Sequence, residues 1–431
     1  MASHRKLVER IADLFNWPQQ HWRLLLLLGC LLLLAGEGPP PGLLETLIDR
    51  QLAGYKFDFV SWETGALFGK LVHNLVAPQR YMDEEARHDF VVDYMALVGE
   101  IQKLEWDISL VYIDPSVADP DVASAEMRAR LADLRADQQA RQPLAEAILE
   151  EQVATVLIEE GFGVLGQELP PVSAHFTPLP SLIVISPRDR IENIFSLSLH
   201  HGLDTAQRED IEMQVDSALN VSSLVTNIGG LAAYPSMLLE SSWLPWVAEV
   251  TAHEWTHHYL TPRPLGWYYM ESGETRTINE TTASIMGKEI GYAVITRYYP
   301  ELPTLPEPVE EEEPEEEIPP PEPPEFDYRM EMRNTRIRVD ELLAEGKIEE
   351  AETYMEERRQ IFVNEGYAIR KLNQAYFAFH GSYADAPGAA GEDPIGPTVL
   401  RLRARSPSLY IFVNQVAGVT RLSELEMLLS E

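Results

Sequence analysis

Cysteine is nearly absent from this chain, since Cys30 is the single one in 431 residues. One cysteine excludes an intramolecular disulfide and any zinc site built from Cys-x-x-Cys pairs. Basic residues are also scarce: 34 Lys and Arg stand against 69 Asp and Glu, which gives a formal net charge of −35. Because nucleic-acid binding depends on clustered Lys and Arg, this composition argues against a nucleic-acid partner. Any metal ion must therefore be held by histidine and carboxylate side chains.

Long apolar runs are missing too, except for residues 24–36 (LLLLLGCLLLLAG). Basic residues before the run and Glu37 after it form the charge asymmetry that keeps an N-terminus in the cytoplasm. The run spans roughly 20 Å as a helix, less than a bilayer core of about 30 Å, so it also suits a signal peptide. We expect residues 1–42 to form a cytoplasmic N-terminus and a retained single-pass membrane anchor, with the remaining chain extracytoplasmic. A cleaved signal, giving a secreted protein, and a buried core helix are the alternatives.

The rest of the sequence divides into four parts that together predict an α+β fold. Residues 43–170 carry apolar side chains at three- and four-residue intervals, which predicts helices. The long, highly charged segment 123–161 is expected to form an elongated helix or a helical hairpin. Residues 171–300 mix strand and helix patterns and form the expected α+β domain, with a helix at about 205–219 and a tight turn between strands at Gly229-Gly230. Residues 301–327 hold 12 acidic residues, nine prolines and no basic residue, a composition typical of an extended linker or insert. Residues 328–431 are expected to be helical and to complete a cleft, with a loop at 387–397.

The strongest motif is His253-Glu254-Trp255-Thr256-His257, an HExxH pattern within a segment of helical periodicity. Residues four apart on a helix share a face, so His253 and His257 can present both imidazoles to one metal ion. Glu254 then lies beside the metal, where it can take a proton from bound water. A chain of this composition contains such a pattern by chance about 3% of the time, so a coincidental motif in a helical interaction protein is one alternative.

A third ligand is expected from the segment Asn279-Glu280-Thr281-Thr282-Ala283. Glu280 follows His257 by 23 residues, which leaves room for a loop and a returning helix. Small residues on the same helix would let it approach the HExxH helix closely: Ala283, Ser284 and Gly287. Two histidines and one glutamate with an open fourth position are the ligand set of many catalytic zinc sites. Three other glutamates are alternative ligands: Glu271, Glu274 and Glu289.

The pair of motifs HEWTH and NETTA resembles the gluzincin metallopeptidases, the thermolysin-like and M1-like group. The resemblance implies a zincin-like catalytic domain in which His253, His257 and Glu280 hold Zn²⁺. It also implies that Glu254 is the general base and proton shuttle in the hydrolysis of a peptide or protein substrate. Ser284 stands where thermolysin-like enzymes carry an acidic partner for a zinc-bound histidine. This departure favours the alternative of a non-catalytic envelope scaffold that keeps a zincin fold.

Gluzincins add a Tyr or His that donates a hydrogen bond to the oxyanion of the tetrahedral intermediate. In AYFAFHGSY, the residues Tyr376, His380 and Tyr383 have the spacing of one helix face. Tyr383 and His380 are the candidate donors, and Tyr383 is preferred because it lies at the expected helix end beside Gly381. An aromatic core stripe is the alternative interpretation.

Two other histidine positions are expected to lie outside the metal site. On a helix, His258 is rotated by about 100° from His257, which predicts a surface or supporting histidine. The pair His200-His201 follows an alternating segment and is expected to end a strand.

Overall fold

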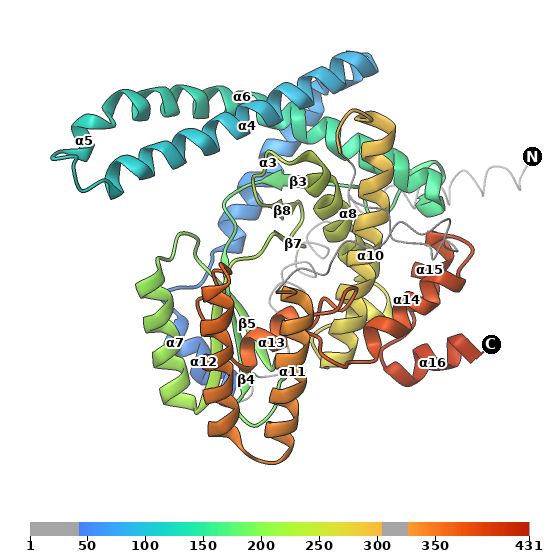
Figure 1. The fold of residues 1–431 in the computed structure, drawn as a ribbon. Coiled ribbons are helices and arrows are strands. Elements are labelled where there is room, and N and C mark those ends of the chain that lie inside the picture. Colours follow the sequence, from blue (N-terminus) through green and yellow to red (C-terminus); the bar gives the residue numbers. More distant parts are fainter. Residues whose placement is uncertain (1–42, 304–325, 431) are drawn as a thin grey trace, which may run out of the picture. The chain divides into compact units, whose positions relative to one another are not determined.

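The computed structural model describes residues 43–303 and 326–430, which form a mixed α+β fold rich in helix (Figure 1). The chain divides into two compact units, residues 1–54 and 55–431, and each is described by itself. In the first unit, the described element is α2 (Leu43–Leu52). All elements below belong to the second unit. The α+β class expected from the sequence is confirmed at this level.

Five helical segments open the second unit: α3 (Phe59–Val76), η1 (Pro78–Tyr81), α4 (Glu84–Ile113), α5 (Pro120–Ala123) and α6 (Ala125–Leu157). Helices α4 and α6 lie side by side as a long hairpin with α5 at its tip (Figure 1). Of the two forms expected for the segment 123–161, the structure shows the elongated helix, α6. The α4 helix begins where the Asp83 carboxylate accepts a hydrogen bond from the Ala86 N–H, an N-cap that satisfies a free backbone donor. A short π-helical turn, η2 (Ile158–Phe162), ends the hairpin.

Eight strands are found among the described residues: β1 (Gly163–Val164), β2 (Gln167–Glu168), β3 (Ala174–Phe176), β4 (Ser181–Pro187), β5 (Phe195–Leu199), β6 (Val221–Thr226), β7 (Gly230–Leu231) and β8 (Ser236–Leu238). One sheet has the order β5-β4-β6 and is antiparallel throughout. The other has the order β3-β8-β7, with a parallel β3–β8 pair and an antiparallel β7–β8 pair. Strands β1 and β2 form a separate hairpin. Helix α7 (Thr205–Leu219) has the bounds of a helix predicted from the sequence, and it packs on β6.

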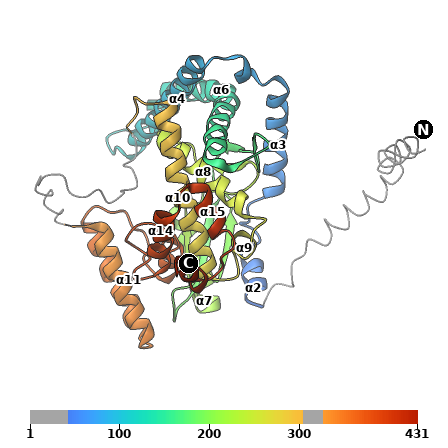
Figure 2. The same ribbon diagram turned by 90° about the vertical axis from the view of Figure 1, so that its right-hand side faces the viewer.

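Two helices form the centre of the second unit: α8 (Leu244–Leu260) and α10 (Gly273–Tyr298), joined through the short α9 (Pro264–Trp267). They lie against each other in both views (Figures 1 and 2). The main hydrophobic core surrounds them and includes Trp255, Met286 and Ile290, each at most 1% exposed. The two helices are therefore held rigidly by packing on several sides.

The C-terminal part is helical, as expected: α11 (Tyr328–Ala344), α12 (Ile348–Asn364), α13 (Gln374–His380), α14 (Ile395–Arg405), α15 (Leu409–Val416) and α16 (Leu422–Ser430). The loop expected at 387–397 ends earlier than predicted, because α14 begins at Ile395. Pro397 lies in the first turn of this helix, where proline is tolerated.

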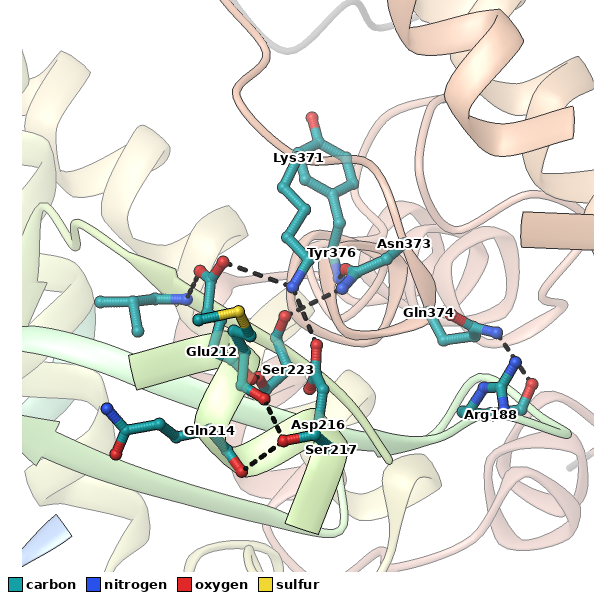
Figure 3. A network of polar contacts seen from close by, with 12 residues as sticks. Arg188, Glu212, Gln214, Asp216, Ser217, Ser223, Lys371, Asn373, Gln374 and Tyr376 are labelled. Atoms are coloured by element: carbon teal, nitrogen blue, oxygen red, sulfur yellow. Dashed lines mark hydrogen bonds and ion pairs between the residues drawn. The ribbon is translucent and has the colours of Figure 1, made fainter. Parts of the chain in front are cut away.

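A polar network ties the start of α13 to the β5-β4-β6 sheet (Figure 3). The Arg370 guanidinium donates to the carboxylate of Glu212, which is 2% exposed and also accepts from the Val225 N–H at 2.6 Å. The Asn373 side chain donates to the Ser223 carbonyl at 2.9 Å and caps α13 by accepting from the Tyr376 N–H. The network therefore fixes α13, and with it the residues that follow, relative to the sheet.

The prediction of a membrane-anchored protein is overturned. Within residues 43–303 and 326–430, no helix is both long enough and apolar enough to cross a bilayer. The apolar run at 24–36, and the alternatives considered for it, lie outside the described residues, as does most of the acidic segment 301–327.

Candidate metal centre

Helix α8 carries both histidines of the HExxH motif on one face. Pro245 lies in its first turn, where its missing N–H costs no hydrogen bond, and buried apolar residues on the opposite side hold it in the core. The Nε2 atoms of His253 and His257 lie 3.1 Å apart, and the two side chains are 14% and 15% exposed. The predicted one-face arrangement of these imidazoles is therefore present.

Helix α10 brings Glu280 to this face. A Cβ atom at Gly287 would lie 2.8 Å from the Glu249 carbonyl oxygen and 3.1 Å from the His253 Cβ, so glycine is what permits the close approach of α10 to α8. Oε2 of Glu280 lies 3.5 Å from His253 Nε2 and 3.7 Å from His257 Nε2. The small residue predicted to allow close packing thus does so.

The three side chains have the geometry of a metal-binding group. One donor atom from each of His253, His257 and Glu280 lies within 4.8 Å of the other two. The Glu280 Oε2 atom is buried and has no hydrogen-bond partner among the described residues, a costly state for a carboxylate oxygen. A cation between this oxygen and the imidazole nitrogens would satisfy it, and two imidazoles with one carboxylate suit zinc.

The alternative glutamate ligands are directed elsewhere. The Arg403 guanidinium donates two hydrogen bonds to the Glu289 carboxylate, each 2.7 Å long. The Glu274 carboxylate accepts from the Leu422 N–H at 3.1 Å. Glu271 is exposed in the loop before α10. Of the four candidates, the structure brings Glu280 to the histidines.

Burial and mutual charge set the protonation of the group. Burial would raise the pKa of Glu280, but His257, His253 and the Tyr269 hydroxyl outweigh it and hold that pKa well below its usual range. Burial lowers the pKa of His257, whereas at His253 the nearby carboxylates of Glu280, Glu254 and Glu249 together outweigh burial and raise the pKa. Burial also raises the pKa of Glu254 to about 7. The site thus combines an ionised carboxylate with a second carboxyl group poised near neutral pH.

Asn279 is a supporting residue that the sequence reasoning missed. Its Oδ1 lies 2.8 Å from His257 Nδ1, and its Nδ2 donates to the Leu265 carbonyl at 3.2 Å. Because the amide donates to Leu265, its oxygen faces the histidine and accepts the proton on Nδ1. This leaves the lone pair of His257 Nε2 directed at the metal group. Thermolysin-like enzymes carry a carboxylate where this chain has Ser284; here the side chain that contacts a histidine of the group is the Asn279 amide.

Tyr269 is a second residue missed from the sequence. Its hydroxyl donates to Oε1 of Glu280, which leaves Oε2 as the oxygen that faces the histidines. Its ring lies edge-on to the His257 ring, with centroids 6.1 Å apart. The segment Trp267-Tyr268-Tyr269 carries neighbouring aromatics, and no periodicity distinguishes the one that turns inward.

The two candidate oxyanion donors have different positions. Tyr383 stacks on the His253 ring at 6.3 Å between centroids and is 38% exposed. Loss of hydration at its hydroxyl, together with the nearby carboxylates of Glu280 and Glu254, raises its pKa well above the usual value, so the phenol stays protonated. His380 packs instead on Tyr376, with centroids 4.2 Å apart, and burial lowers its pKa to about 4. The structure therefore brings Tyr383 to the metal group and leaves His380 in an aromatic cluster.

Strand β7 passes beside the side chain of Glu254. A Cβ atom at Gly230 would lie 2.2 Å from Oε1 of Glu254, so any larger residue here would displace this carboxylate. The sequence indicated Gly229-Gly230 as turn residues; the contact with Glu254 gives Gly230 a different role. Strand β7 pairs with β8 on one side and is an edge strand of its sheet.

The remaining histidines are placed as the sequence suggested. His258 Nε2 lies 3.1 Å from the Ser236 hydroxyl, and its ring contacts Tyr234. His200 and His201 directly follow β5. Neither position belongs to the metal group found among the described residues.

No protein-family model matches this chain, and no curated protein and no solved structure is similar to it. The resemblance to gluzincins consequently rests on four residues: His253, Glu254, His257 and Glu280.

Proposed function

We propose that this protein is a zinc-dependent peptide-bond hydrolase with a zincin-like catalytic domain. The observation that carries the proposal is the buried, unpartnered Glu280 Oε2 facing His253 Nε2 and His257 Nε2. These three residues would hold the zinc ion. When bound at such a site, zinc polarises a carbonyl group and lowers the pKa of a water molecule to about 7.

Glu254 supplies the proton transfer in this proposal. It follows His253 directly on α8, and burial raises its pKa to about 7. A carboxyl group with a pKa near the working pH can accept a proton from the attacking water and return it to the leaving amine. The close contact with Gly230 restricts where this carboxylate can move.

Tyr383 is the proposed oxyanion donor. Its hydroxyl lies among Glu280, Tyr269 and Glu254 and stays protonated, so it can donate to a developing negative charge. The network around Glu212 and Asn373 supports this role because it fixes α13, three residues ahead of Tyr383.

The edge of β7 favours an extended peptide as substrate. An extended chain can pair with the free edge of a strand through main-chain hydrogen bonds. Because β7 lies beside Glu254, a peptide paired there would run past the group that transfers the proton. The alternative of a non-catalytic scaffold was motivated by Ser284. The contact of Asn279 with His257 supports the catalytic proposal, because one of the two histidines has an orienting partner.

The test combines elemental analysis with hydrolysis of a peptide library by the purified full-length chain. We expect one zinc ion per chain, and hydrolysis that a chelator abolishes and added zinc restores. Glu254→Gln should keep the zinc and lose hydrolysis by about 10²–10⁴-fold. Glu271→Gln, at an exposed glutamate in the loop before α10, is the matched control and should leave both unchanged. A chain without stoichiometric zinc, or a Glu254→Gln variant with full activity, would overturn the proposal.

A further inference from the structure

Helix α3 packs on the rest of the second unit through its polar side. The Lys70 ammonium contacts both Glu146 and Glu150 of α6 at 2.7 Å. The Trp62 indole donates to the Thr177 hydroxyl at 3.2 Å, and Ala66 is the buried apolar residue of the helix. In an ordinary surface helix the apolar stripe faces inward. In α3 the charged Lys70 faces the rest of the unit instead.

The outer side of α3 is apolar and uncharged. Six apolar side chains form three pairs of neighbouring residues, and successive pairs are four residues apart. Each of the six is between 42% and 78% exposed: Leu67, Phe68, Leu71, Val72, Leu75 and Val76. The two charged residues of the helix, Glu63 and Lys70, are both partly buried, so the exposed side carries no charge. Figure 2 shows α3 at the margin of the second unit. We call these six residues the α3 face.

Two glycines flank the α3 face one turn apart. A Cβ atom at Gly65 or Gly69 would meet nothing within 4 Å, so the described residues leave this part of the helix uncovered. Small residues four apart let the backbone of a second helix approach closely. The surface is therefore shaped for another helix with an apolar, uncharged side.

We propose that the α3 face binds the same face of a second copy of this chain. An exposed apolar surface of this extent on one helix marks an interaction site, and its partner must bury no charge against it. The α3 face itself meets that requirement, and a two-fold axis would place it against its own copy. The six side chains expose roughly 700 Å² per copy, close to the roughly 800 Å² per partner of a standard stable interface. This interface is independent of the proposed hydrolase activity.

The charge of the protein predicts how salt affects the association. Each copy carries a formal net charge of −35, so two copies repel each other. Salt screens that repulsion, and the α3 face contains no ion pair that salt would weaken. Dimerisation should therefore tighten as salt rises, which is opposite to an interface held by ion pairs.

The test measures the mass of the full-length chain by sedimentation equilibrium at several concentrations and salt levels. We expect dimers of twice the 48.7 kDa chain mass, favoured by salt. Leu71→Gln combined with Leu75→Gln should raise the dissociation constant at least about tenfold. Met213→Gln is the matched control, because Met213 is a 63% exposed apolar residue on a different helix, and it should leave the dimer unchanged. The replaced residues are exposed in each copy, so circular dichroism should show that all variants fold.

A second measurement locates the contact directly. Leu71 lies at the centre of the α3 face, where a two-fold axis brings equivalent residues together. In a Cys30→Ser chain, Leu71→Cys should form a disulfide-linked dimer on mild oxidation, and Met213→Cys should not. A monomer at all concentrations, a dimer indifferent to the α3 variants, or a monomer that uses the α3 face to bind phosphatidylcholine vesicles would overturn the proposal.

Discussion

At the scale of single residues, the hydrogen bond between Asn279 and His257 decides which nitrogen of the histidine can serve a metal. The Asn279 Oδ1 atom accepts the Nδ1 proton at 2.8 Å, so Nε2 keeps its lone pair. We predict that Asn279→Ala lowers the zinc affinity about 10–100-fold, because the imidazole loses its orienting partner. Asn279→Asp should recover much of that loss. Competition with a chromophoric chelator measures the affinity, and the exposed Asn364→Ala serves as control.

Tyr269 acts on Glu280 in the same way. Its hydroxyl binds Oε1, and a hydrogen bond to a charged group contributes about 1.5–3 kcal/mol. Tyr269→Phe should therefore weaken zinc binding by about tenfold or more while the ring keeps its packing. The neighbouring Tyr268→Phe, in the same loop but 40% exposed, should have no effect. Equal affinities for the two variants would show that Tyr269 does not position the ligand.

The metal ligands and their supporting residues differ in how far the sequence predicts them. His253 and His257 lie four apart on one helix, so periodicity alone places them together. Glu280 needed the additional inference of a returning helix, which the contact at Gly287 confirms. Asn279 and Tyr269 were missed because their roles depend on how α10 and the preceding loop turn toward α8. Spacing along the chain does not carry that information.

At the scale of elements, α3 and α6 are joined by a buried ion pair whose contribution depends on pH. Burial would raise the pKa of Glu146, but the Lys70 ammonium, with His175, outweighs it and lowers that pKa from 4.5. The unfolded chain then binds more protons than the folded one below about pH 4.5. Stability from Glu146 is therefore present above that pH and is lost as the pH falls further.

Glu146→Gln tests this linkage. We predict a loss of about 3 kcal/mol in the free energy of unfolding at pH 7, because the substitution breaks a buried pair. The difference in unfolding free energy between wild type and Glu146→Gln should shrink as the pH falls from about 4.5 toward 2. Urea unfolding across this range measures it, with Glu151→Gln, a more exposed neighbour on α6, as control. A difference independent of pH would mean that Glu146 acts through packing and not through its charge.

Helices were predicted better than the contacts between elements. The helix at 205–219 and the elongated helix α6 follow from the spacing of apolar residues, which is a local signal. The division of the strands into two three-stranded sheets and a separate hairpin, with β3 paired to β8 at a separation of 62 residues, is a long-range outcome. The same holds for Tyr383: the sequence placed it at a helix end, but its approach to His253 depends on the packing of α13 against the sheet.

At the scale of the whole molecule, the net charge of −35 separates into parts with different consequences. Residues 301–327 contribute −12, which leaves −23 for the remaining chain. Away from the metal group, Lys70 and Arg370 neutralise buried carboxylates, and Arg403 pairs with the partly buried Glu289. Charge thus bears on solubility and on association between copies, whereas the chemistry depends on a few buried groups.

Zinc should also stabilise the second unit as a whole, because its proposed ligands join α8 to α10 at the centre of the core. A ligand that binds the folded state alone adds about 4 kcal/mol at a free concentration 1,000 times its dissociation constant. We predict that a chelator lowers the unfolding temperature and that added zinc restores it. Glu280→Gln should abolish this response, and Glu271→Gln should retain it, as differential scanning calorimetry would show. If zinc stabilised Glu280→Gln as strongly as wild type, the ion would be bound elsewhere, and Glu280 would be a buried carboxylate without a metal.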